Sequence, residues 1–154
     1  MTKKLKITIL TGDDELNISL KNYIRFVLTN MISQIYIAKL GKPETINVNM
    51  LDSDLWIIEA FNPEDPTNPE GFRTAKKLAS KAKFLLIFID MPYKDFFKNC
   101  KFCLKLPSEI LLKKKIIEII NGPKPTIKSF ETLENACPRL KKQPSHHHRR
   151  QKNG

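Results

Sequence analysis

The sequence lacks the features of a secreted or membrane-bound protein. Its three cysteines, Cys100, Cys103 and Cys137, are odd in number and show no disulfide-framework spacing, which is typical of a reducing compartment. The longest apolar run, residues 84–89, is far shorter than a membrane span. The basic start is followed by an apolar run that stops at Thr11, too short for a secretion signal. We therefore expect a cytoplasmic protein without membrane contact.

Glycine and acidic residues are also scarce. Five glycines stand against ten prolines, and 16 Asp and Glu against 27 Lys and Arg, which gives a formal net charge of +11. This charge favours acidic proteins, nucleic acid or anionic lipid as partners and does not choose among them. With 154 residues, 41% of them hydrophobic, the chain can pack one domain and is too short for a multidomain enzyme.

The positive charge is concentrated near the end of the sequence. Residues 122–154 hold eight basic residues against two acidic ones, which is +6 of the total of +11. Beyond Phe130 there is little hydrophobic periodicity, and residues 141–150 have almost no apolar side chains to offset the entropy of ordering. We therefore predict one domain over residues 1–122 and a basic, disordered C-terminal tail over residues 123–154.

Strand-like and helix-like segments alternate ahead of that tail. The apolar, strand-like segments are residues 5–10, 35–38, 55–58, 84–89 and 102–104. The helix-like segments are residues 16–31, 72–82, 93–98 and 107–121, whereas residues 44–51 fit either a short helix or an extra edge strand. This order predicts an α/β fold with a doubly wound, five-stranded parallel sheet and helices on both faces.

Charged residues follow the predicted strands, at the edge where ligands bind in such folds. They are Asp13, Asp14, Glu59, Asp90 and Lys105. Carboxylates grouped with one lysine could hold a divalent cation and an anionic group together. Taken singly, each is more simply explained as a solvated loop charge.

Three stretches resemble the receiver domain of bacterial two-component response regulators. Residues 54–59 are similar to the third strand, which ends in the phosphoaccepting Asp, and Pro63 stands where the family has its loop proline. Gly71 is similar to the glycine that opens helix three, and residues 104–107 are similar to the fifth strand with its lysine. The likeness covers about residues 5–121. It implies a receiver-like (flavodoxin-like) fold and a signalling role without enzyme activity.

The chain departs from this family at the phosphoacceptor and at the metal-binding acids. Glu59 stands at the phosphoacceptor position, where its extra methylene carries the carboxylate into the space of the phosphoryl group and metal. An ungapped alignment places Thr11 and Gly12 at the acidic pair, and only a two-residue shift supplies Asp13 and Asp14. No cofactor is therefore expected, and Mg²⁺ would bind only weakly, through Asp13 and Asp14.

The switch positions depart as well. Ile89 or Asp90 replaces the Thr or Ser after strand four, and neither can donate a hydroxyl hydrogen bond to a phosphoryl oxygen. Phe102 occupies the aromatic switch position three residues before Lys105. We predict a pseudo-receiver in which a Glu59–Lys105 ion pair fills the pocket and regulated phosphorylation does not occur. The alternative is that Glu59 is a buried acid satisfied by Lys105 without signalling meaning.

Lysines gather where a receiver usually meets its partners, on helix four, strand five and helix five. They are Lys94, Lys98, Lys101, Lys113, Lys114 and Lys115. Such a face suits the acidic surface of another signalling protein, and a homodimer is also compatible with it. The alternative function is a nucleic-acid-associated protein that uses its basic tail through salt-sensitive contacts. A third alternative, redox or zinc chemistry at Cys100 and Cys103, is disfavoured because the motif enters a strand rather than opening a helix.

Overall fold

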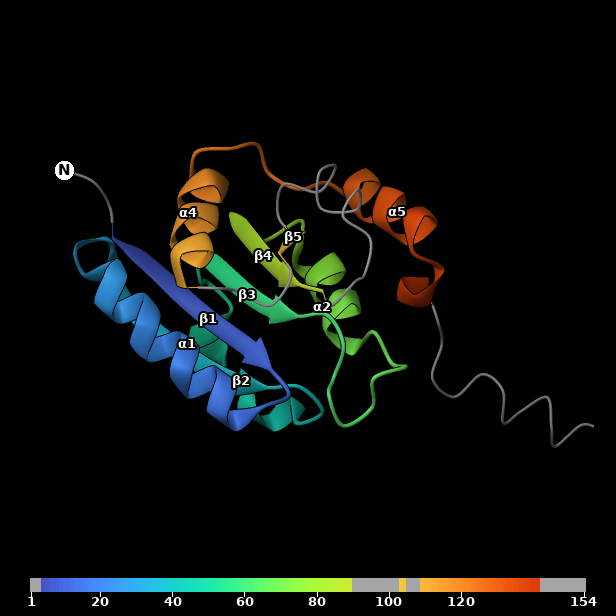
Figure 1. Cartoon of the computed structure of the whole chain (residues 1–154), viewed down its shortest axis with the longest axis horizontal. Helices are drawn as coiled ribbons and strands as arrows, with labels where there is room; N and C mark the ends of the chain where they lie inside the picture. Colours follow the sequence, from blue (N-terminus) through green and yellow to red (C-terminus); the bar gives the residue numbers. More distant parts are fainter. Residues whose placement is uncertain (1–3, 90–102, 105–108, 142–154) are drawn as a thin grey trace, which may run out of the picture.

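The computed structural model describes residues 4–89, 103–104 and 109–141, and its strands form one parallel sheet (Figure 1). The strands are β1 (Leu5–Thr11), β2 (Ile32–Lys39), β3 (Leu55–Glu59), β4 (Phe84–Phe88) and the two-residue β5 (Cys103–Leu104). They lie in the order β2-β1-β3-β4-β5, and each neighbouring pair is parallel. The predicted α/β class with a parallel sheet is confirmed. Because successive connections leave β1 in opposite directions, the carboxyl ends of β1 and β3 border the crevice in which such folds bind ligands.

Helices connect and follow these strands. They are α1 (Asp14–Val27), α2 (Glu70–Leu78), α4 (Glu109–Ile120) and α5 (Ile127–Ala136). Short 3-10 turns cover Thr29–Met31, Pro43–Thr45, Val48–Met50 and Pro138–Lys141. Residues 44–51 therefore form neither the short helix nor the edge strand that their pattern allows, and β2 and β3 are joined by two single turns. Within the described ranges, no helix is long and apolar enough to cross a membrane.

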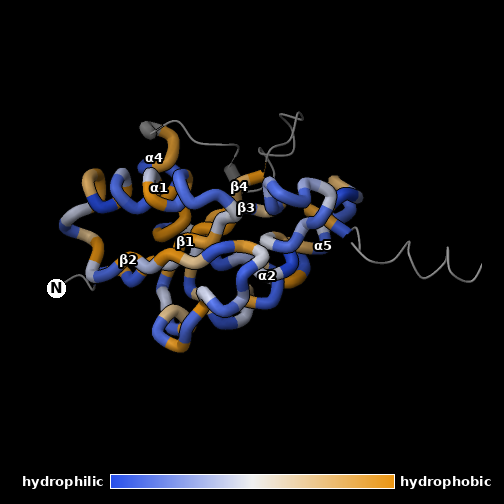
Figure 2. Tube along the Cα trace, turned by 90° about the horizontal axis from the view of Figure 1, so that it is seen from below, coloured by the Kyte–Doolittle hydropathy of each residue, from blue (hydrophilic) through white to orange (hydrophobic). Residues whose placement is uncertain are grey.

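The strand side chains alternate between two apolar clusters on opposite faces of the sheet. Ile57 of β3 belongs to the cluster that includes α1 and α4, whereas its neighbours Trp56 and Ile58 belong to the cluster that includes α2 and α5. All three are almost completely buried. Figure 2 shows the apolar segments gathered along the strands between these helices. This explains why the sequence of β3 has no polar alternation, since both of its faces are covered.

The prediction of a disordered tail beginning at residue 123 is wrong for residues 127–141, so the packed domain does not end at residue 122. Thr126 and Ser129 form a capping box that starts α5. Phe130 is fully buried, with its ring centroid 5.4 Å from that of Phe72 on α2. Glu134 of α5 pairs with Lys76 of α2 at 2.7 Å. The hydrophobic contacts of α5 and the following turn therefore offset the entropy that was expected to keep this segment unfolded.

Candidate functional site

The candidate site lies at the carboxyl edge of the sheet, around Glu59. This residue ends β3, as its position after the apolar run predicts, and its side chain is half-buried. The backbone N–H of Gly12, just after β1, donates a 2.9 Å hydrogen bond to Oε1 of Glu59. The carboxylate therefore ties the end of β3 to the loop that leads into α1.

Gly12 allows two loops to approach closely beside this hydrogen bond. A Cβ atom at this position would lie 2.5 Å from Oδ1 of Asn62 and 2.6 Å from Cδ of Pro63. Oδ1 of Asn62 already accepts a hydrogen bond from the backbone N–H of Glu64 at 3.0 Å. No side chain fits at position 12 without moving this loop. Gly12, which aligns with one member of the receiver family's acidic pair, therefore has a structural role in this chain.

Asp13 and Asp14 have partners away from Glu59. Oδ1 of Asp13 accepts hydrogen bonds from the backbone N–H groups of Glu15 at 2.9 Å and Leu16 at 3.3 Å, which caps α1. Asp14 pairs with Lys39 at 3.2 Å. Across the part of the chain that the structure describes, no group of three His, Cys, Asp or Glu side chains could hold a metal ion. The two acids thus stabilise the start of α1 and its contact with β2.

The environment of Glu59 favours its neutral form. Burial raises the pKa of the carboxyl above its ordinary value, the hydrogen bond from Gly12 opposes this, and the charge of Asp13 raises the pKa further. A carboxyl with a raised pKa binds its proton more tightly in the folded chain than in the unfolded chain. Ionisation of Glu59 is therefore linked to a loss of stability.

Glu59→Gln is expected to flatten the pH dependence of stability on the acid side of neutrality. The stability that Glu59 contributes is fully present below the ordinary pKa of a glutamic acid and is lost as the pH rises through the higher folded-state pKa. Glutamine keeps an oxygen for the Gly12 N–H and does not titrate. Denaturant unfolding across this pH range measures the effect, with exposed Glu64→Gln as the control for losing one carboxylate nearby. Parallel profiles for Glu59→Gln and the parent protein would contradict the expectation.

A cavity of about 270 Å³ opens beside Glu59. Its lining residues are Glu59, Phe61, Asn62, Pro63, Pro66, Phe88 and Arg139. The guanidinium of Arg139 lies 4.9 Å from the centroid of the Phe61 ring, in the range of a cation–π contact. One acid and one cation therefore share a cavity whose other walls are mainly aromatic rings and prolines.

Arg139 was missed by the sequence reasoning because it lies in the segment expected to be disordered. The turn Pro138–Lys141 brings it to this edge, and Leu140 of that turn is buried. The available signal was the spacing of three and four residues that separates the buried side chains of this segment. These are Phe130, Leu133, Cys137 and Leu140.

Some of the other predicted site residues lie within the described ranges, and the rest lie outside them. Ile89, at the switch position, is fully buried after β4 and belongs to the cluster with α2 and α5. Six predicted residues lie outside the described residues, namely Asp90, Lys94, Lys98, Lys101, Phe102 and Lys105. The predicted Glu59–Lys105 ion pair therefore remains a prediction.

The lysines of α4 divide by exposure. Lys113 and Lys114 are exposed, whereas Lys115 is half-buried. Burial lowers the pKa of the Lys115 ammonium, and the nearby Glu118 carboxylate opposes that effect. The first two lysines are therefore the ones that α4 exposes most fully to solvent.

Comparisons with known proteins agree with the architecture. No family model and no curated protein matches the sequence. The signal receiver domain of a DNA-binding response regulator (merR) from Colwellia psychrerythraea 34H superposes with a TM-score of 0.57 and 16% identity, over 77% of this chain and all of that one. A fusion that includes the trimeric coiled coil of yeast Spc42 superposes with a TM-score of 0.54 and 13% identity, over 77% of this chain and 78% of that one. At such identities the similarity concerns the fold alone, and it shows that this chain has a receiver-like α/β fold.

Proposed function

We propose that this protein is a signalling module of receiver fold that acts through contacts with other proteins and is not an enzyme. The observation that carries the proposal is Glu59 at the carboxyl end of β3, hydrogen bonded to Gly12 where a phosphorylatable receiver needs a free aspartate. The similarity to a structure named as the signal receiver domain of a response regulator supports the signalling role.

Three features of the carboxyl edge argue against regulated phosphorylation. Glu59 places a carboxylate where the phosphoryl group would form, and Gly12 engages one of its oxygens. Asp13 would have to leave the cap of α1 in order to bind Mg²⁺. Ile89 offers no hydroxyl to a phosphoryl oxygen. The arrangement favours one fixed state over an equilibrium that a ligand could shift.

Incubation of the full chain with acetyl phosphate and Mg²⁺ tests the proposal. Intact mass spectrometry is expected to show only the unmodified chain, under conditions in which a phosphorylatable receiver domain is labelled. Glu59→Asp is also expected to remain unmodified, because it restores the acceptor without restoring the acidic pair at positions 11 and 12. A stoichiometric, hydroxylamine-labile acyl phosphate on the parent protein would overturn the proposal.

The nucleic-acid alternative relies on the predicted basic C-terminal tail, and residues 127–141 of that tail are folded. Within residues 127–141, Arg139 lies over Phe61 and Lys141 donates a 3.0 Å hydrogen bond to Asn135. Glu134 is engaged with α2. Because residues 127–141 pack on the domain, their cations lie on a folded surface and not on the free arm that the nucleic-acid alternative expects, whereas residues 142–154 lie outside the described residues.

A further inference from the structure

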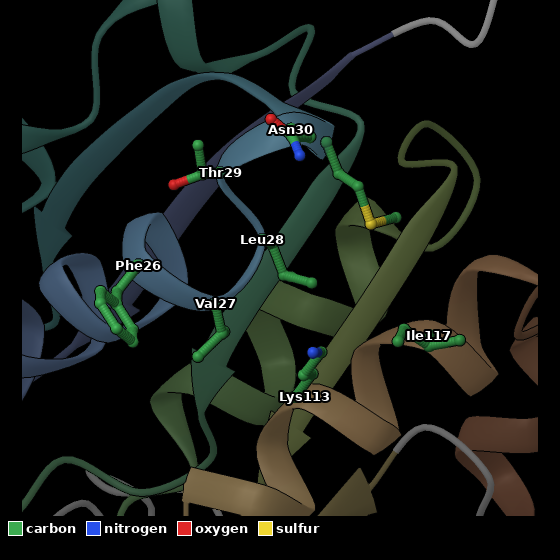
Figure 3. Close-up of a pocket in the computed structure, with 8 residues that line it drawn as sticks. Phe26, Val27, Leu28, Thr29, Asn30, Lys113 and Ile117 are labelled. Atoms are coloured by element: carbon green, nitrogen blue, oxygen red, sulfur yellow. The ribbon is translucent and has the colours of Figure 1, made fainter.

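A hollow of about 280 Å³ lies where α1 ends beside α4, which we call the α1–α4 groove (Figure 3). Its lining residues are Phe26, Val27, Leu28, Thr29, Asn30, Met31, Lys113 and Ile117. Figure 3 shows the end of α1 on one side of the hollow, with Lys113 and Ile117 of α4 on the other. Since α1 starts at the carboxyl edge and runs away from it, this groove is separate from the cavity at Glu59.

The apolar side chains of the groove are unusually open to solvent. Phe26 is 81% exposed, and Met31 and Ile117 are each 37% exposed. Phe26 is not needed to fill the core, because α1 already buries Leu20 and Ile24 against the sheet. An apolar patch that is contiguous, hollowed and formed by two elements marks an interaction site more often than single exposed side chains do.

The charge around the groove is mainly positive. Residues 21–31, which form the second half of α1 and the following turn, contain Lys21 and Arg25 and no acid. Residues 111–120 of α4 contain Lys113, Lys114 and Lys115 against the single acid Glu118. Five cations therefore stand against one anion along the two sides. A second copy of this chain, with its net charge of +11, would be repelled, whereas an acidic partner would be attracted.

We propose that the α1–α4 groove binds an acidic amphipathic helix of a partner protein. Its apolar side chains pack on Phe26, Met31 and Ile117, and its flanking carboxylates face Lys113 and Arg25. An amphipathic helix fits such a groove through anchors at positions i, i+3 or i+4, and i+7. The proposal deepens the proposed function by naming where the partner binds, and it shares Lys113 with the lysine face that the receiver resemblance predicts.

Titration with two designed helical peptides tests the proposal on the full chain. Both repeat Leu at i, i+3, i+4 and i+7, and one has Glu and the other Lys at the flanking positions. The Glu peptide is expected to bind and to shift the NMR methyl signals of Met31 and Ile117, while the Lys peptide is not. Phe26→Ala should weaken binding roughly tenfold or more, as expected for a central aromatic anchor. The matched control is Val48→Ala, because Val48 is 76% exposed and lies away from the groove.

Reversing the charge of Lys113 tests whether the groove recognises the charge of its partner. Lys113→Glu is expected to weaken binding of the Glu peptide and to improve binding of the Lys peptide, because it changes the sign of a residue that lines the groove. Equal binding of both peptides, no binding of the Glu peptide, self-association through Phe26, or shifts confined to other surfaces would each overturn the proposal. A chain that accepts phosphate and still binds the Glu peptide through Phe26 would overturn the proposed pseudo-receiver function and leave this docking site standing.

Discussion

Phe130→Ala is expected to lower the free energy of unfolding by about 3–5 kcal/mol, the usual cost of deleting a fully buried phenylalanine ring. The side chain has no exposed surface and contacts the ring of Phe72, so its removal leaves a cavity between α5 and α2. If α5 were an unfolded arm, the same substitution would cost almost nothing. Denaturant unfolding, with the midpoint and the slope determined separately, measures the difference.

Ile127→Ala is the matched control for this experiment. It removes an aliphatic side chain from the same helix, at a position that is 47% exposed, and surface substitutions of this kind usually change stability by less than about 0.5 kcal/mol. A small and equal effect of both substitutions would contradict the packing of α5. The same packing has a practical consequence, because a chain ending at residue 122 would uncover the apolar side of α2 that Phe130 covers.

The sheet was predictable because its signals are local and strong. The run around Trp56 and the run at residues 84–89 contain no polar positions, and strands covered on both faces require such runs. The end of α4 was equally readable, since Gly122 follows its last turn and Pro123 comes next. Residues 44–51 were ambiguous because period-two alternation over so few residues does not separate a strand from short 3-10 turns.

Helix α5 was not predictable by the same reasoning because charge concealed its apolar stripe. Glu131, Glu134 and Arg139 lie between the buried side chains of this stripe, Lys128 and Lys141 flank it, and a high net charge is the usual sign of disorder. Thr126 provides a helix-start signal, but its capping partner is Ser129 rather than the more recognisable Glu or Gln. The stripe gains its stability from α2, so only the tertiary contact shows that the segment folds.

The candidate site also contains features that the sequence predicted and features that it did not. The position of Glu59 after β3 followed from the pattern of one strand, whereas the cavity beside it depends on a residue eighty positions later in the chain, Arg139. The role of Asp13 was also hidden, because an acid before a helix is equally a cap and a metal ligand until its hydrogen bonds are known. Sequence therefore located the edge of the sheet that matters, and the contacts decided what each side chain does there.

Gly71→Ala is expected to destabilise the protein, against the direction that helix propensity predicts. Alanine in a helix is ordinarily about 0.5–1 kcal/mol better than glycine. Here the added Cβ would lie 1.7 Å from the carbonyl oxygen of Glu59 and 3.1 Å from Cγ2 of Ile58. Since these are atoms of the central strand, the first turn of α2 must move away from β3, and such overpacking typically costs 1–3 kcal/mol or more.

The displacement should reach the candidate site, because the same turn is fixed to β3 by its backbone. The N–H of Phe72 donates a 3.1 Å hydrogen bond to the carbonyl of Ala60, one residue beyond Glu59. Unfolding measurements should therefore show lower stability, and the amide signal of Gly12, which reports its hydrogen bond to Glu59, should shift in the NMR spectrum. Lys77→Ala, an exposed change on the same helix, should leave both unchanged. A gain in stability from Gly71→Ala would show that helix propensity outweighs the contact and that α2 does not lie against the end of β3 as closely as the structure places it.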